Sequence, residues 1–325
     1  MEESRGEHRR KWAKKYGILP KLSMERRKDF HDYHSRRIYM ITLVAEERRP
    51  LLGTLQDKDE SHSEPWIKYS SIGEEVINYW KKIPIKYPEI RLIAIQLMPD
   101  HMHGILFVTK EIGIHLGNVI AWFKKECNAA SLKRSGVSLW KSGYNDIILS
   151  GKDQLQKMVH YLQDNPRRLW VKRHKREYFT IKNNITVGGW NVASVGNQFL
   201  LDYPLKAVVQ CSRSIITKED IDKEVHKYMT LAQNGSVLVS ASISKAEKAV
   251  MRAAYEAKCK VIVILENGFS SMWKPGGKQF EACAEGRLLL VAPWDHHNQV
   301  KTITREQCLQ LNNLAQAIAE TTTTM

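Results

Sequence analysis

The sequence predicts two domains of different fold class, an α+β domain with an antiparallel sheet followed by an α/β domain with a parallel sheet. The first expectation rests on residues 90–98 and 104–108, two apolar strands separated by a short break, which is typical of an antiparallel pair. The second rests on near-continuous Val, Ile and Leu strands that alternate with helices beyond residue 205. The composition changes near residues 180–200, where we place the boundary.

In the first part, strands and helices mix without regular β-α-β alternation, which favours an antiparallel sheet. The elements expected there are a strand at 37–44, a polar loop at 53–65, a helix at 72–82, the strands at 90–98 and 104–108, a helix at 116–134, a short strand within 139–149 and a helix at 152–165. We expect Pro166 to end the last helix, because proline has no backbone N–H to donate.

In the second part, four apolar segments read as buried strands, at 207–211, 235–240, 260–265 and 287–291. Helices are expected at 245–257 and 277–284. The predicted organisation is a basic N-terminal extension (1–28), the α+β domain (29–180), a linker (181–204) and the α/β domain (205–325).

The charge of the chain points to a polyanion. The formal net charge is +15, and residues 1–180 hold 34 Lys and Arg against 22 Asp and Glu. An excess of positive charge concentrated in one half of a chain is typical of nucleic-acid binding. No apolar stretch reaches the ~18 residues needed to span a bilayer, and the charged N-terminus does not resemble a secretory signal. We therefore expect a cytoplasmic, nucleoid-associated protein with no membrane partner.

Two histidines carry the first sign of chemistry. His101 and His103 stand on either side of Met102, so in an extended segment both imidazoles point to one face and Met102 points to the other. Two imidazoles on one face of a sheet can bind a divalent ion whose shell is completed by oxygen ligands. The alternative is a polar rim of two histidines beside a turn. The five cysteines are scattered and form no zinc motif, so we expect reduced and mostly buried thiols.

The string from Met98 to Leu106 resembles the signature of HUH endonucleases. In particular it resembles the single-strand transposases and their relatives, the REP-associated tyrosine transposases. The segment Tyr161-Leu162-Gln163-Asp164-Asn165-Pro166 is similar to the tyrosine-containing helix of that group, and Trp140-Lys141-Ser142-Gly143-Tyr144 to the stretch before it. The resemblance spans roughly residues 30–170 and implies an HUH endonuclease, ferredoxin-like fold.

The resemblance implies cleavage and rejoining of single-stranded or hairpin DNA through a covalent 5′-phosphotyrosine. Tyr161 is then the nucleophile, and His101, His103 and Asn165 hold Mg2+ or Mn2+. Tyr161 and Asn165 are four residues apart, so one helix places them on the same face. No flavin, nicotinamide or ATP is required. Relatives work as monomers or as dimers, and the sequence does not decide between monomer and homodimer.

Several alternatives stay open for these residues. Tyr144 is the rival nucleophile, although it has no amide partner at helical spacing. Asp146 and Asp164 could supplement the metal shell, and His160 is expected to be exposed. Tyr161 could also be no more than the polar edge of a packed helix.

Basic residues near the expected site are candidates for DNA contact. Six Lys and Arg with one interleaved Trp fill residues 167–176, which suits a phosphate backbone and a stacked base. From this run we expect contacts by Arg167, Arg168, Lys172 and Arg173. The resemblance adds Lys124 and Lys125, which follow an aromatic residue. Residues 9–28 are similarly basic and could grip a hairpin stem.

Residues 205–295 resemble the Rossmann-like domain of DNA-processing protein A and its lysine-decarboxylase-like relatives. The order of strands and the late Pro293 match, but the glycine-rich phosphate turn is replaced by residues 240–245, Ser-Ala-Ser-Ile-Ser-Lys. We interpret this domain as an accessory binding module. Two other functions remain as alternatives: a DNA or RNA hairpin-binding protein that has lost its chemistry, and a nucleotide-binding or nucleotide-hydrolysing activity in the second domain.

Overall fold

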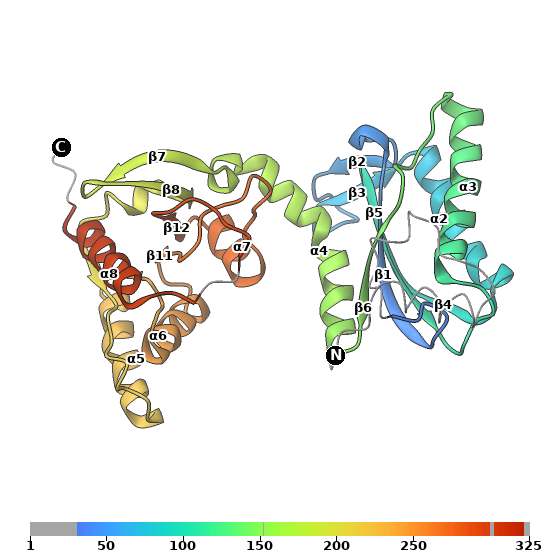
Figure 1. Ribbon diagram of the computed structural model, residues 1–325. Coiled ribbons are helices and arrows are strands. Elements are labelled where there is room, and N and C mark those ends of the chain that lie inside the picture. The colour runs from blue at the N-terminus through green and yellow to red at the C-terminus, as the bar shows by residue number, and fades with distance from the viewer. Residues whose placement is uncertain (1–30, 152, 300–301, 322–325) are drawn as a thin grey trace. The chain divides into compact units, whose positions relative to one another are not determined.

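In the computed structural model, which describes residues 31–151, 153–299 and 302–321, the chain divides into two compact units, Met1–Trp170 and Val171–Met325 (Figure 1). The division falls inside α4 (Gln154–His174), ten residues before the predicted end of the first domain at 180. The basic extension at 1–28 lies outside the described residues. Among the described helices, none has the length and apolar character that a bilayer crossing demands.

The first unit is built on an antiparallel sheet of four strands in the order β4-β5-β1-β6. Its strands are β1 (Arg37–Val44), β4 (Ile90–Met98), β5 (His101–Val108) and β6 (Asn145–Leu149). The antiparallel sheet mixed with helices confirms the predicted architecture. Strand β5 begins at His101, three residues earlier than expected, because the Pro99-Asp100 break is a tight turn that pairs Met98 directly with His101.

Each face of this sheet has its own helical cover (Figure 1). On one face, Ile41, Met102 and their neighbours pack against α2 (Ser71–Lys86) and α3 (Leu116–Ser135) in a large core. On the other face, Met40, Ile105 and Leu149 pack against Leu162 of α4. We call these the α2–α3 face and the α4 face. Helix α2 begins where the side chain of Ser70 accepts a hydrogen bond from the backbone N–H of Gly73.

Two expectations for the first unit are wrong. Residues 53–65 are not all loop, because β2 (Gly53–Gln56) pairs with β3 (Trp66–Tyr69) in a two-stranded ribbon beside β4. The polar Thr54 and Gln56 hid this strand from a search for apolar alternation. Helix α4 does not end at Pro166 but continues to His174. The buried proline leaves one backbone hydrogen bond unmade at a cost of about 3 kcal/mol, which the packing of the helix offsets.

The second unit contains a six-stranded sheet in the order β7-β8-β12-β11-β10-β9. Its strands are β7 (Lys182–Val187), β8 (Trp190–Gly196), β9 (Lys206–Val208), β10 (Val237–Ser240), β11 (Val261–Ile264) and β12 (Leu288–Ala292). Strands β9 to β12 are parallel, as predicted, whereas β8 and β7 add an antiparallel edge. The linker expected at 181–204 is therefore wrong for most of its length. Gly188 and Gly189, both with positive φ, close the β7–β8 hairpin.

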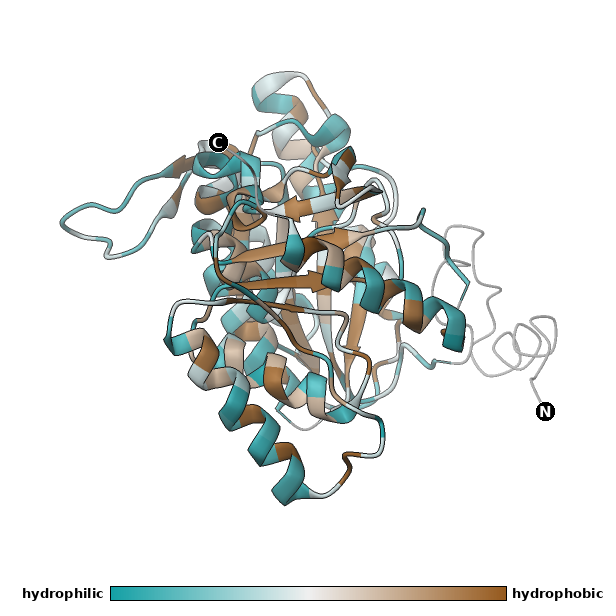
Figure 2. Ribbon diagram, turned by 90° about the vertical axis from the view of Figure 1, so that its left-hand side faces the viewer, coloured by the Kyte–Doolittle hydropathy of each residue, from teal (hydrophilic) through white to brown (hydrophobic). Residues whose placement is uncertain are grey.

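Helices cover both faces of the second sheet. One face packs against α5 (Lys218–Gln233), α6 (Lys245–Glu256) and α7 (Gly277–Ala284), and the other against α8 (Arg305–Glu320). The strands are mostly apolar and the outer faces of the helices mostly hydrophilic (Figure 2). Helices α5 and α8 were not predicted, although Thr217 and Thr304 cap their N-termini. Short 3-10 turns lie at Glu46–Arg48 (η2), Arg176–Phe179 (η3) and Gln198–Leu200 (η4).

Candidate active site

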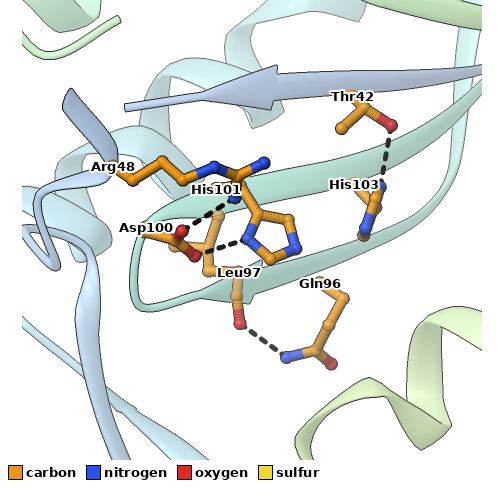
Figure 3. A network of polar contacts seen from close by, with 7 residues as sticks. All are labelled: Thr42, Arg48, Gln96, Leu97, Asp100, His101 and His103. Carbon is orange, nitrogen blue, oxygen red and sulfur yellow. Dashed lines mark hydrogen bonds and ion pairs between the residues drawn. The ribbon is translucent and has the colours of Figure 1, made fainter. Parts of the chain in front are cut away.

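His101 and His103 open strand β5 and lie on the α4 face of the first sheet. Their ring centroids are 5.0 Å apart. Met102 between them is fully buried in the core of the opposite face, as strand alternation predicts. Register places Thr42 of β1 and Gln96 of β4 on either side of His103 (Figure 3).

His101 is oriented by the residue before it. Its Nδ1 donates to the carboxylate of Asp100 at 2.6 Å, and Arg48 donates to the other oxygen of that carboxylate at 3.0 Å (Figure 3). Burial by itself raises the pKa of Asp100, but the hydrogen bonds and positive charges of His101 and Arg48 outweigh burial and lower the pKa to about 2. The carboxylate is therefore ionised at neutral pH and fixes the His101 ring.

His103 is buried and neutral. Its Nδ1 shares a hydrogen bond of 2.8 Å with the Thr42 hydroxyl. Burial, followed by the neighbouring His101, lowers the pKa of His103 to about 4. A neutral imidazole is the form that binds metal ions. Since both rings use Nδ1 inside the protein, and no residue in the described ranges bonds either Nε2, the two Nε2 atoms are available to an external ligand.

Tyr161 lies over this pair from helix α4. Its ring centroid is 6.0 Å from that of His103, and the guanidinium of Arg168 lies 5.7 Å from the centre of the Tyr161 ring. The Tyr161 side chain is 37% exposed, so a large substrate can reach it. Arg168 is about two turns further along the same helix, which puts a positive charge beside the phenol.

Asn165 follows Tyr161 by one helical turn and is buried. It lies on the side of α4 that also carries Leu162, which packs against Met40 and Ile105 of the sheet. Its Nδ2 atom is buried, and no described residue forms a hydrogen bond with it. A 180° flip of the Asn165 amide exchanges its nitrogen and oxygen, so that Oδ1 takes the position of Nδ2.

The donor set fits a hard or borderline divalent ion. It consists of two imidazoles that are held by other groups at Nδ1, and one buried amide whose Nδ2 has no partner among the described residues. Over the described residues there is no cluster of three His, Cys, Asp or Glu that could hold a metal ion without such an amide. The fit therefore depends on Asn165.

Three other predicted residues do not join this group. Asp146 lies on the α2–α3 face, where it accepts a hydrogen bond of 2.8 Å from Tyr33. Tyr144 packs against the core of that same face. Asp164 is paired with Arg167 at 2.5 Å and with Arg168 at 3.8 Å. Asp146 and Tyr144 thus lie on the face opposite His101 and His103, the Asp164 carboxylate is paired with two arginines, and His160 is exposed, as expected.

The predicted DNA-binding residues are divided between different places. Lys124 and Lys125 belong to α3 on the opposite face from the histidines, and the Lys124 ammonium donates to the backbone carbonyls of Lys141 and Gly143. Lys124 thus holds the loop before β6. Arg167 and Arg168 lie on α4 within the first unit, next to Tyr161.

Lys172 and Arg173 belong to the last turn of the same helix, in the second unit, where the Lys172 ammonium lies over the ring of Phe280. DNA contact by these six residues stays a prediction.

Sequence reasoning missed the groups that support the histidines. Thr42 and Arg48 carry no motif of their own. Strand register brings Thr42 to His103, and the 3-10 turn η2 after β1 brings Arg48 to Asp100, the partner of His101. Asp100 carried a signal, since an acidic residue directly before the first histidine was visible in the sequence. Gln96 carried no signal, because its place beside His103 depends on the register between β4 and β5.

The turn after β10 in the second unit is occupied by the protein itself. The Glu247 carboxylate accepts hydrogen bonds from the backbone N–H groups of Cys211, Ile243 and Ser244, and its side chain is buried. These are the donors that a phosphate at this turn would use. Where the glycine-rich turn is replaced, the Glu247 carboxylate of the protein itself therefore binds these N–H groups in place of a phosphate.

Comparisons with known proteins give partial likenesses. No family model matches the chain. An uncharacterized protein of Haemophilus influenzae is 20% identical over 157 residues, which cover 42% of this chain and 83% of that protein.

Three solved structures are similar to part of the chain. A REP-associated tyrosine transposase bound to a REP hairpin has 16% identity and a TM-score of 0.32, over 42% of this chain and 70% of its own. A candidate transposase from Deinococcus radiodurans has 13% identity and a TM-score of 0.28, over 42% of this chain and 97% of its own. DNA-processing protein A from Helicobacter pylori, whose structure was solved for its single-stranded DNA binding mode, has 19% identity and a TM-score of 0.33, over 46% of this chain and 69% of its own.

Proposed function

We propose that the first unit cleaves and rejoins single-stranded or hairpin DNA, with Tyr161 as the nucleophile. The observation that carries the proposal is the meeting of Tyr161 with His103, at 6.0 Å between ring centroids, on the one face where His101 and His103 also lie together. A tyrosine that merely packed against the sheet needs neither histidine. The resemblance of residues 98–106 and 161–166 to the HUH transposases supports the same chemistry.

In this proposal the Tyr161 oxygen attacks the scissile phosphorus and forms a bond to it, while the bond from phosphorus to the 3′ oxygen breaks. The phenolic proton is given up, and the leaving 3′ oxygen gains a proton to become a free hydroxyl. The 5′ phosphate remains on Tyr161 as a phosphodiester. Attack of a 3′ hydroxyl on that phosphorus reverses the step, so rejoining needs no nucleotide cofactor.

We further propose that His101, His103 and Asn165 hold Mg2+ or Mn2+. A bound divalent ion polarises the scissile phosphate and offsets negative charge on the leaving oxygen. Three features support this assignment. Asp100 and Thr42 orient the two rings, and burial keeps His103 neutral. Helix α4 carries the Asn165 amide one turn from the nucleophile. Arg168 supplies fixed positive charge next to Tyr161.

With a 3′-labelled DNA hairpin that carries single-stranded flanks and Mn2+, the protein should form a labelled protein–DNA adduct that survives denaturation on a gel, because the piece of DNA downstream of the cut stays on Tyr161. Tyr161→Phe should form none, because it removes only the attacking oxygen. Tyr144→Phe is the matched control and should form the adduct normally, since Tyr144 packs on the opposite face.

An adduct that persists in Tyr161→Phe would show that another group is the nucleophile. Hairpin binding without an adduct, in either metal, would instead support the binding-only alternative. Chelation by EDTA and the double change of His101 and His103 to Ala should each abolish the adduct, which separates the metal part of the proposal from the nucleophile.

A further inference from the structure

A pocket of about 770 Å³ lies in the first unit next to the candidate active site. Its walls come from the loop and strand at residues 61–69, from Glu74 of α2, from Gln96 of β4 and from Gln163 and Pro166 of α4. The size is within the range of ordinary small-ligand sites, roughly 300–1,000 Å³. Neither the histidines nor Tyr161 line it, so the proposed cleavage chemistry leaves the pocket unexplained.

One wall of the pocket is a fixed aromatic platform. The rings of His62 and Trp66 are stacked, with centroids 4.0 Å apart and planes inclined by 10°. Asp59 holds both of them, since it accepts from His62 Nδ1 at 2.9 Å and from Trp66 Nε1 at 3.2 Å. Both rings are only half-buried. A flat, preorganised aromatic surface of this kind is what unpaired nucleobases stack on.

The polar groups of the pocket suit a base rather than a phosphate. The lining includes the carboxylates of Glu64 and Glu74 against a single lysine, Lys68, which disfavours an anion. Gln96 donates its Nε2 to the backbone carbonyl of Leu97 at 2.8 Å, so its Oε1 is left to accept (Figure 3). Acceptors of this kind match the exocyclic amino groups of adenine, cytosine and guanine, which thymine does not have.

The pocket is also in the right place. Gln96 is the cross-strand partner of His103, so the two side chains are neighbours on the α4 face (Figure 3). Gln163 lies on α4 between Tyr161 and Asn165 in the sequence. A DNA strand whose phosphate reaches Tyr161 and His103 can therefore place a nearby base over Trp66.

We propose that this pocket binds one unpaired, amino-bearing base of the DNA strand close to the scissile phosphate, and that it selects the cleavage position. The proposal rests on the proposed function of the first unit and extends it to a specificity site. Trp66 and His62 supply the stacking surface, and Gln96 and Gln163 supply the contacts to the base edge.

The test is an abasic scan of the single-stranded flanks of a hairpin oligonucleotide. The full-length Tyr161→Phe protein is used in EDTA, so that cleavage does not interfere, and the dissociation constant is measured by fluorescence anisotropy. One flank position should stand out, with affinity about tenfold weaker when its base is removed. Replacing that base by thymine should weaken binding as well, and the three amino-bearing bases, adenine, cytosine and guanine, should each bind better than thymine.

Combining the scan with protein variants identifies the pocket. Trp66→Ala should weaken binding of the intact oligonucleotide by about the same factor, and the penalty for the abasic position should then vanish. Trp66→Phe should retain most of the affinity. Trp122→Ala, which removes another half-buried tryptophan on the α2–α3 face, is the matched control and should leave the scan unchanged.

The result that overturns the proposal is a flat scan, or an abasic penalty that remains in full when Trp66 is absent. Should Trp66→Ala fail to fold, Gln163→Ala at the exposed helix surface replaces it, and the base preference at the singled-out position should fall. The adduct assay tests the cleavage chemistry independently of the abasic scan, which tests the pocket. An adduct with a flat scan refutes only the pocket, whereas a positive scan without an adduct refutes only the cleavage chemistry.

Discussion

At the scale of single residues, the candidate site depends on groups that hold the histidines rather than on the histidines alone. His101 and His103 both offer Nε2 because Asp100 and Thr42 occupy Nδ1. A ligand ring that is hydrogen-bonded at its far nitrogen has a fixed orientation and tautomer. Thr42 therefore acts as a positioning residue in the proposal, and its hydroxyl is the part that matters.

Thr42→Val should lower Mn2+ affinity about 10- to 100-fold, because it removes the hydroxyl from His103 but keeps the shape of the side chain. Calorimetric titration of the DNA-free protein with Mn2+ measures this. Thr54→Val, on the exposed ribbon strand β2, is the control and should bind Mn2+ like the original protein. Equal affinity in Thr42→Val would show that the hydroxyl does not orient a ligand.

The cysteines show how burial sets reactivity at the same scale. All five are free and four are buried, and burial raises the pKa of both Cys127 and Cys283 to about 12. The thiolate is the reactive form. Iodoacetamide should therefore modify Cys259, the half-buried one, first in the native protein, and Cys127 and Cys283 should stay unmodified even at pH 9. Mass spectrometry of digests measures this, with urea-unfolded protein as the control; early labelling of Cys127 or Cys283 would contradict the expectation.

At the scale of elements, the site is assembled by strand β5 and helix α4 on one face of the sheet, while helix α2 fixes β5 from behind. Gly104 follows His103 directly, and its missing side chain makes room for Trp80 of α2. A Cβ at Gly104 meets the Trp80 ring at 2.5 Å, and Trp80 is 1% exposed. The close approach of helix and strand behind the histidines thus requires glycine.

Gly104→Ala should lower the free energy of unfolding by about 1–3 kcal/mol, because a fully packed tryptophan cannot move aside without strain. Urea denaturation measures this. Gly113→Ala, where a Cβ meets nothing within 4 Å, should change stability by no more than about 0.5 kcal/mol. Similar effects of the two substitutions would mean that the β5–α2 contact is not tightly packed.

Helix α4 shows where element prediction from sequence succeeds and fails. The sequence predicted a helix at 152–165 that carries the tyrosine, and the structure confirms it, with Leu155, Val159 and Leu162 packed on the sheet. The prediction that Pro166 ends it is wrong, since local propensity was outweighed by packing on both sides of the proline. The ribbon β2–β3 was not predicted from the sequence. Its strands are short, β2 is polar, and they are stabilised by pairing with each other and by contact with β4.

At the scale of the whole molecule, the net charge of +15 is the property that bears on a nucleic-acid partner. If DNA binding releases counterions from phosphates, affinity for a hairpin oligonucleotide should fall at least about tenfold between roughly 50 and 200 mM salt. The logarithm of the binding constant should fall linearly with the logarithm of salt concentration. A peptide nucleic acid of the same sequence, with an uncharged backbone, is the control and should bind weakly with little salt dependence. A slope near zero with DNA would contradict a phosphate-based interface.

Also at this scale, the second unit keeps the predicted parallel strands but adds β7 and β8 where a linker was expected. The Gly188-Gly189 pair, with Val187 before it and Trp190 after it, was a visible hairpin signal. In the same unit, the buried Glu247 carboxylate accepts hydrogen bonds from backbone N–H groups that a phosphate would need. This favours an accessory role of the unit over nucleotide chemistry.

The sequence by itself determined the shared face of His101 and His103, the helix that carries Tyr161 and Asn165, and the class of both sheets, because periodicity and residue type are local properties. Only the tertiary structure decided that α4 covers the same face as the histidines, that Thr42 and Gln96 flank His103, and that Asp146 lies on the opposite face. Strand order, register and the choice of face depend on contacts between residues far apart in the chain, and no local pattern encodes them.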